Sequence, residues 1–200
     1  MFKNAIILFA LLLTIQFLYS QEAKIDQKAP DFTLHDIVGM DFPLSDYRNK
    51  IVVLEWINFD CPYVQKHYKS GNIPNMQAEY TKKGVYWFSI CSSAPGKQGN
   101  LPVGEIRKRI KEYNAKMTSY LLDEDGKVGK MYGAKTTPHF FIIDKDGTLV
   151  YSGAVDDIAS TDIEDIKKAR NYVREVLDAL LNGEKPKIKT TKPYGCSVKY

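Results

Sequence analysis

Cys61 is the residue whose type and surroundings most directly suggest chemistry in this sequence of 200 residues. It comes shortly after the apolar run IVVLEWINF (51–59) and directly precedes Pro62. Proline is well tolerated in the first turn of a helix, so the pattern predicts that Cys61 caps a helix N-terminus. Unpaired N–H groups and aligned peptide dipoles favour a thiolate there, and the thiolate is the reactive form. Cys61 is therefore a candidate nucleophile; the alternative is a small buried hydrophobe.

Charged neighbours pull the local potential at Cys61 in opposite directions. Lys66 and His67, about one and a half turns into the predicted helix, would add positive potential. Asp60 would oppose it, unless its carboxylate bonds to local backbone N–H groups. His35 and His67 are expected to lie on the surface rather than to bind a ligand.

A partner for Cys61 has to come from a distant part of the chain. Val64 stands where a dithiol motif would carry its second cysteine, which leaves Cys91 and Cys196. Cys91 ends an apolar strand pattern and is expected in the core. The 13 residues from Gly183 to Cys196 reach roughly 43–47 Å when extended, against a radius of gyration of roughly 16 Å for a domain of this size. Spacing alone does not choose among the three pairings.

The hydrophobic patterns alternate between strand and helix periods. Together they predict an α/β sandwich around a central mixed sheet, preceded by an N-terminal β-hairpin. The predicted elements are a hairpin in 29–50, a buried strand over 51–59, a helix from 62 interrupted at 70–74 and ending at 83, a strand over 85–91, a helix over 104–114, an extended piece at 119–123, a hairpin in 136–157 and a long helix over 161–183 that Thr161 and Glu164 would cap.

The two ends of the chain differ from this domain. Residues 1–20 have a basic start, an apolar centre and a small final residue, as expected of a secretory signal. The domain is expected to span 24–182, and 183–200 to be an irregular tail that carries Cys196. The product is expected to be exported, periplasmic or secreted, without stable membrane insertion after signal removal. The net charge of +4, with scattered basic residues, argues against nucleic-acid binding.

Four ordered segments resemble the AhpC/TSA (redoxin) group of peroxiredoxin-like proteins. They are APDFTLHDIVG with FPLSDYRNK, VVLEWINFDCPYVQKHY, YLLDEDGKVGKMYGAKTTPHFFIID and DGTLVYSGAVDD. The resemblance implies a thioredoxin-like three-layer fold with Cys61 as the reactive cysteine, faced by a cis-proline loop at Thr137 and Pro138. The chain departs from the typical peroxiredoxin pattern at Leu54 and Asn58, where the group carries Pro and Thr or Ser. Asn58 could still bind substrate.

This resemblance leads to the expectation of a thiol peroxidase without a cofactor. Cys61 would attack a hydroperoxide, and Cys196, in a Gly-Cys-Ser tail similar to those of such proteins, would resolve the sulfenic acid to a disulfide. An external thiol reductant, such as a thioredoxin-like protein, would then restore the pair. An active-site arginine is not placed, because Arg107 and Arg109 are expected to face solvent.

Three alternatives remain open at this point. The same pair could act on protein disulfides as a thiol–disulfide oxidoreductase. The fold could be non-catalytic, or bind a soft metal through Cys61, His139 and a tail thiol, although no metal site is predicted. Finally, Cys196 could form a static disulfide or link two chains.

Overall fold

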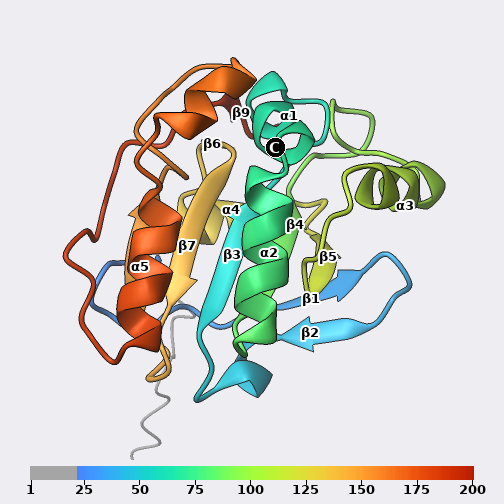
Figure 1. Cartoon of the computed structure of the whole chain (residues 1–200). Coiled ribbons are helices and arrows are strands. Elements are labelled where there is room, and N and C mark those ends of the chain that lie inside the picture. Colours follow the sequence, from blue (N-terminus) through green and yellow to red (C-terminus); the bar gives the residue numbers. More distant parts are fainter. Residues whose placement is uncertain (1–21) are drawn as a thin grey trace, which may run out of the picture.

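A computed structural model describes residues 22–200, so the predicted signal segment 1–20 lies outside the described residues. A seven-stranded sheet runs through the centre in the order β2-β1-β5-β4-β3-β7-β8 (Figure 1). Its strands are β1 (Thr33–Asp36), β2 (Asp41–Pro43), β3 (Val52–Trp56), β4 (Tyr86–Cys91), β5 (Ser119–Leu122), β7 (His139–Ile143) and β8 (Leu149–Gly153). A second, two-stranded sheet joins β6 (Thr136–Thr137) to β9 (Cys196–Ser197).

Helices cover both faces of the large sheet. They are α1 (Pro62–Lys69), α2 (Asn72–Lys82), α3 (Val103–Glu112), α4 (Lys127–Tyr132) and α5 (Tyr172–Leu181), with 3₁₀ turns η1 (Leu44–Tyr47) and η2 (Ile163–Lys167). In Figure 1, α2 and α5 lie in front of β3 and β7, and α4 lies behind. Each face has its own apolar core, and α1, α2 and α5 share the larger one. Among residues 22–200, no helix has both the length and the apolar character that a membrane crossing needs.

The strand directions confirm the predicted thioredoxin-like α/β fold. β3 pairs with β4 and β4 with β5 in parallel, whereas β7 and the β1–β2 hairpin are antiparallel. Every side chain of β3 is buried, as the near-continuous apolar run predicted. The predicted interruption of the first helix is also present, because Gly71 has a φ of +76° between α1 and α2.

The long helix predicted over 161–183 is wrong. The segment forms η2, then leaves helical geometry, and α5 begins only at Tyr172. Asn171 caps α5 by accepting a hydrogen bond from the N–H of Arg174 (2.9 Å) and forms a β-bridge with Asp156. Ile163, assigned to the apolar face of the long helix, is 41% exposed. A tertiary cap at Asn171 therefore outweighs the local capping pattern at Thr161.

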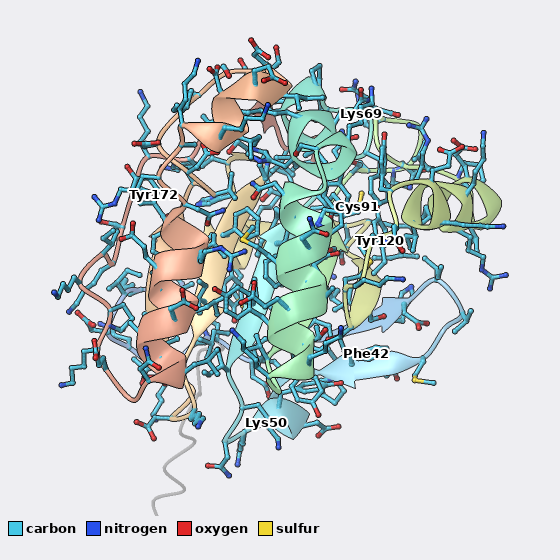
Figure 2. The ribbon with its side chains drawn as sticks, in the orientation of Figure 1. Phe42, Lys50, Lys69, Cys91, Tyr120 and Tyr172 are labelled. Atoms are coloured by element: carbon cyan, nitrogen blue, oxygen red, sulfur yellow. The ribbon has the colours of Figure 1, made fainter. Side chains whose placement is uncertain are left out.

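Figure 2 shows side chains all around the sheet and its helices, with Cys91 and Tyr120 beside each other near β5. Cys91 is buried as expected, and its thiol donates to the carbonyl of Gly99 (3.4 Å). The same core holds the fully buried carboxylate of Glu55, in the middle of β3.

Four donors surround the Glu55 carboxylate. They are Trp87 Nε1 (2.7 Å), Tyr68 Oη (2.9 Å), Ser89 Oγ (2.9 Å) and Gln77 Nε2 (3.2 Å). Burial raises the pKa of Glu55, and these hydrogen bonds act in the opposite direction. Because the donors come from β4, α1 and α2, the carboxylate ties the sheet to the helix that carries Cys61.

We expect Glu55→Gln to lower the free energy of unfolding by about 2–4 kcal/mol, because an amide N–H₂ would face donors and leave them unpaired. Urea unfolding at neutral pH measures this, with the exposed Glu184→Gln as matched control. Equal stability of the two variants would mean that the carboxylate does not hold these elements together.

Candidate active site

Cys61 lies where the sequence predicted it, at the N-cap of α1. Its backbone is extended (φ −77°, ψ 124°), Pro62 begins the helix, and the N–H of Gln65 donates to the carbonyl of Cys61 (2.9 Å). The Cys61 side chain accepts no hydrogen bond from the N–H groups of the helix. Instead, the thiol donates to the carbonyl of Thr137 at 3.0 Å. The Cys61 residue is 0% exposed.

The loop that faces Cys61 is the one expected from the resemblance. The peptide between Thr137 and Pro138 is cis. Thr137 is 3% exposed, and its hydroxyl has no hydrogen-bond partner in the described part of the chain. Thr137 therefore offers Cys61 a backbone carbonyl and lies on the opposite wall of the site.

The C-terminal tail, predicted to be irregular, instead contributes a strand to this site. β9 pairs antiparallel with β6, so that Cys196 stands opposite Thr137 and Ser197 opposite Thr136. Gly195 makes this approach possible: its φ is +138°, and a Cβ there would lie 2.1 Å from the Thr137 carbonyl oxygen. The strand brings the Cys196 thiol against that of Cys61.

The two thiols influence each other. Burial first, then the hydrogen bond and charge of Cys61, raise the pKa of Cys196 to about 11. Lys199 acts in the opposite direction. Cys196 is half-buried, whereas Cys61 is fully buried, and both are free thiols in this structure.

Contacts on both sides of Cys196 hold the tail in place. They all tie the tail to elements of the domain: Thr191 Oγ1 with Tyr151 Oη (2.7 Å) and with the N–H of Ala154 (2.9 Å), the N–H of Val198 to Lys135 O (3.1 Å), the N–H of Ala94 to Lys199 O (2.9 Å), and Tyr200 Oη to Ala134 O (2.8 Å). Cys196 is therefore fixed at the site rather than carried on a free arm.

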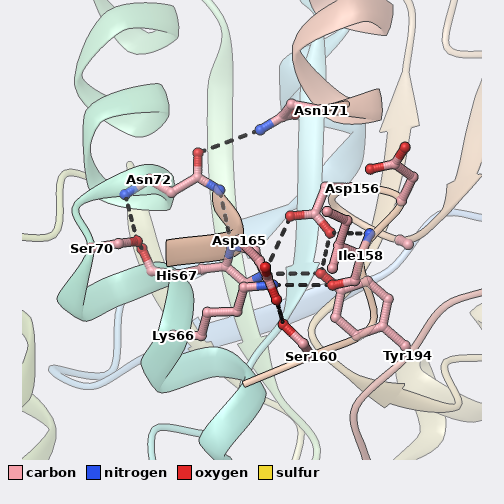
Figure 3. A network of polar contacts seen from close by, with 12 residues as sticks. Lys66, His67, Ser70, Asn72, Asp156, Ile158, Ser160, Asp165, Asn171 and Tyr194 are labelled. Atoms are coloured by element: carbon pink, nitrogen blue, oxygen red, sulfur yellow. Dashed lines mark hydrogen bonds and ion pairs between the residues drawn. The ribbon is translucent and has the colours of Figure 1, made fainter. Parts of the chain in front are cut away.

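A buried polar network adds a further anchor at Tyr194 (Figure 3). The Tyr194 hydroxyl donates to the Asp156 carboxylate and accepts from His67 Nε2 (3.0 Å). The side-chain amide of Asn72 donates to His67 Nδ1 (2.9 Å). Because Nδ1 accepts, the proton of neutral His67 is on Nε2. Tyr194, two residues before Cys196, is thereby bonded to the helix that Cys61 caps.

Two expectations for His67 are wrong, and Lys66 is also buried. His67 is 0% exposed rather than on the surface, and burial, with the neighbouring Lys66 charge, lowers its pKa to about 3. It is therefore neutral near pH 7 and adds no positive charge to the site. Lys66 is 2% exposed, and its ammonium group donates to Ile158 O (3.0 Å) and Ser160 Oγ (3.3 Å). Local sequence shows no sign of either burial, because Ile158, Ser160 and Tyr194 lie 92 or more residues away.

The structure shows what the carboxylate of Asp60, the residue before Cys61, contacts. Asp60 Oδ1 lies 3.6 Å from Arg109 Nη2, and Glu105 Oε1 accepts from Arg109 Nε (2.7 Å). Arg109, expected to face solvent, is thus half-buried beside the loop before Cys61 and partly offsets the negative charge of Asp60.

Asn58 is 1% exposed, and both ends of its amide contact backbone. Its Nδ2 donates to Gln98 O (3.2 Å), and its Oδ1 accepts from the N–H of Asp60 (2.9 Å). The side chain therefore shapes the turn that presents Cys61.

His139 lies on β7, directly after the cis-proline turn. It is 3% exposed, its Nδ1 accepts from the N–H of Lys135 (3.2 Å), and burial lowers its pKa to about 3. Within residues 22–200, no three His, Cys, Asp or Glu side chains are grouped as a metal site requires.

Known proteins resemble the chain in sequence and in structure. A family model described as the AhpC/TSA family matches residues 25–152. The thiol-disulfide oxidoreductase ResA of Bacillus thuringiensis subsp. konkukian is 25% identical over 134 residues, 67% of this chain and 72% of that protein. An uncharacterized conserved protein from Geobacillus kaustophilus is 29% identical, with a TM-score of 0.74 over 88% of this chain and 92% of its own. A putative thiol:disulfide interchange protein DsbE from Chlorobium tepidum is 25% identical, with a TM-score of 0.52 over 66% and 85%.

These relatives correct the expectation of a hydroperoxide-reducing enzyme, which is wrong. The relatives found by sequence are named thiol–disulfide oxidoreductases. One protein of similar structure is named a putative thiol:disulfide interchange protein. The site supplies a physical reason. The chain has Leu54 and Asn58 at the two departures from the peroxiredoxin pattern, and the Asn58 amide is already bonded to backbone at both ends.

We expect alkylation of Cys196 by iodoacetamide in the reduced protein to accelerate about tenfold per pH unit between pH 7 and 9, because the rate follows the thiolate fraction below a raised pKa. Mass spectrometry of the tail peptide measures the rate at each pH. A rate that levels off near pH 8.5 would contradict the pKa of about 11.

The neutral state of buried His67 predicts a pH dependence of stability. Between its lowered pKa of about 3 and its ordinary value of 6.5, the unfolded chain binds a proton that the folded chain does not. The free energy of unfolding should therefore fall as pH falls below 6.5, and His67 contributes up to about 1.4 kcal/mol per pH unit. In His67→Gln this slope should be shallower by that amount, measured by urea unfolding at several pH values between 4.5 and 6.5.

The exposed His35→Gln serves as matched control and should keep the wild-type slope. The raised pKa values of Asp156 and Glu55 give slopes of the opposite sign, but both carboxyls are present in all three proteins. Parallel slopes for wild type and His67→Gln would show that His67 is not held neutral.

Proposed function

The chain belongs to the AhpC/TSA family, and from this premise we propose that it is an exported thiol–disulfide oxidoreductase that acts through the Cys61–Cys196 pair. One observation carries the proposal: the β6–β9 pairing sets Cys196 opposite Thr137, whose carbonyl accepts from the Cys61 thiol. Two cysteines separated by most of the domain are thus neighbours. The names of the relatives support disulfide chemistry.

The proposed reaction is a two-electron exchange. The reduced pair reacts with a disulfide R–S–S–R′ and yields the Cys61–Cys196 disulfide, with two thiols, RSH and R′SH, as products. An external dithiol reductant returns two electrons and two protons to the pair and leaves as a disulfide. No cofactor enters this balance.

The remaining predicted site residues have positioning roles in this proposal. The Thr137 carbonyl orients the Cys61 thiol, and Pro138 sets the turn that brings that carbonyl to it. Asn58 fixes the loop before Cys61 through its two backbone contacts. The signal-like residues 1–20 favour a location outside the cytoplasm, where disulfides persist.

We expect the protein without residues 1–20 to catalyse reduction of insulin by dithiothreitol, and both Cys61→Ser and Cys196→Ser to fall to within about twofold of the uncatalysed rate. Cys91→Ser should retain activity, because its thiol is buried in the core against Gly99. Turbidity of the released insulin chain measures the rate. Full activity in Cys196→Ser would refute the paired mechanism, and hydrogen peroxide consumption run in parallel should not exceed that of an ordinary thiol.

A further inference from the structure

We infer that the partner exchanges disulfides with Cys196 and that Cys61 acts only inside the protein, as the leaving and resolving sulfur. This inference rests on the proposed function and deepens it. It reverses the roles expected from the sequence, in which Cys61 met the substrate and Cys196 resolved the product.

The first argument is access. Thiol–disulfide exchange needs an in-line approach of one sulfur to another, so a sulfur without exposed surface cannot meet a macromolecular partner. Cys61 is 0% exposed and lies between the N-terminus of α1, the cis-proline turn and the tail. Cys196 is half-buried, on a strand whose next residue, Ser197, is exposed. Of the two cysteines, Cys196 is the one with exposed surface at which a partner can approach.

The second argument is that the tail is held over Cys61 by anchors on both sides. Before Cys196, Thr191 bonds to Tyr151 and Tyr194 to the His67–Asp156 pair. After it, Val198 and Tyr200 bond to the chain at Lys135 and Ala134. Exposing Cys61 would require several of these bonds to break together.

Tyr200 shows how closely the end of the chain is fitted to the domain. Its ring lies over Gly126 and Gly129, where a Cβ would come within 2.5 Å and 2.6 Å of tyrosine atoms. Lys130 Nζ stands 5.3 Å from the ring centroid. The last residues of the chain therefore pack against the domain, and the tail that lies over Cys61 is part of the folded structure.

The third argument concerns the leaving group. An attacked disulfide breaks faster when the departing sulfur is stabilised as a thiolate. Cys61 caps α1, whose first N–H groups have no helical acceptors and favour a negative charge. Burial raises the pKa of the Cys196 thiol, which makes a thiolate less favourable at that sulfur. Attack on Cys196 with departure of Cys61 is thus favoured by both access and chemistry.

The exchange balances in two steps. A partner thiolate attacks Cys196 Sγ, the Cys61–Cys196 bond breaks, and Cys61 leaves with the electron pair as a thiolate. The second thiolate of the partner then attacks the partner sulfur that is bonded to Cys196. The partner disulfide forms, and Cys196 is released and takes up a proton. In the opposite direction, Cys196 attacks a substrate disulfide and Cys61 resolves the mixed disulfide.

The test is to locate the mixed disulfide. The oxidised protein lacking residues 1–20 is mixed with excess reduced glutathione, quenched with acid at successive times, alkylated and mapped by mass spectrometry. We expect glutathione on Cys196 and the alkyl group on Cys61, in at least about tenfold excess over the reverse arrangement. Glutathione mainly on Cys61, or equally on both, would overturn the inference.

A second measurement uses single-cysteine proteins, so that the result does not depend on capturing a transient species. Cys61→Ser with Cys91→Ser leaves Cys196, and Cys196→Ser with Cys91→Ser leaves Cys61. Each is labelled with a bulky maleimide, and its rate is divided by the rate of the same protein in concentrated urea. This ratio of the folded to the unfolded labelling rate should be at least about tenfold higher for Cys196 than for Cys61.

A control separates the two proposals. Cys61→Ser with Cys196→Ser leaves buried Cys91 and should label about as slowly as the protein that keeps only Cys61, which shows that the fold is intact. Equal labelling of Cys61 and Cys196 would overturn the inference and leave the paired chemistry standing. Failure of the wild-type protein to form a Cys61–Cys196 disulfide under any oxidant would instead overturn the proposed function.

Discussion

The site depends on the pairing of two very short strands. β6 and β9 have two residues each, and a ladder of this length has little stability of its own. It persists because the tail is bonded to the domain on both sides of it, through Thr191 and Tyr194 before Cys196 and through Val198 and Tyr200 after it. The register of the pair then decides which residue of the tail faces Cys61. A shift by one residue would turn Cys196 to the other face and place Ser197 or Gly195 at the site.

The Tyr194 anchor uses buried polar groups that would be unfavourable alone. His67 is neutral because burial lowers its pKa to about 3, and burial raises the pKa of Asp156. One Asp156 oxygen accepts from Tyr194, while the other has no hydrogen-bond partner in the described residues and lies 3.9 Å from His67 Nε2. A buried polar network of this kind adds little net stability. It instead selects one conformation, because each polar group finds its hydrogen-bond partners in that conformation alone. Here that conformation fixes the path of the tail.

The sequence predicts well what local patterns control. The apolar run of β3, the helix cap at Cys61 and the turn at Gly71 all follow from residue types within one element. Long-range contacts decide the rest. Lys66 and His67 look like surface residues in the sequence, and only Ile158, Ser160 and Tyr194 explain their burial. The predicted helix over 161–183 fails in the same way, since Asn171 is held by its bridge to Asp156. Local patterns predict no structure for the tail, because its bonding partners are spread from Asp26 to Asp156.

Placing the two cysteines far apart in the sequence has a consequence that a dithiol within one helix turn lacks. A disulfide between Cys61 and Cys196 closes a loop of about 135 residues and would restrict the unfolded chain by about 5 kcal/mol in the chain-entropy description. Folding and oxidation are therefore coupled: whatever holds the tail strand in register also favours the disulfide. The anchors around Cys196 favour both folding and oxidation, because they keep the tail over the buried Cys61 and hold the two sulfurs close together. In such an arrangement the tendency of the pair to give or accept electrons is set by contacts of the tail, several residues away from either sulfur.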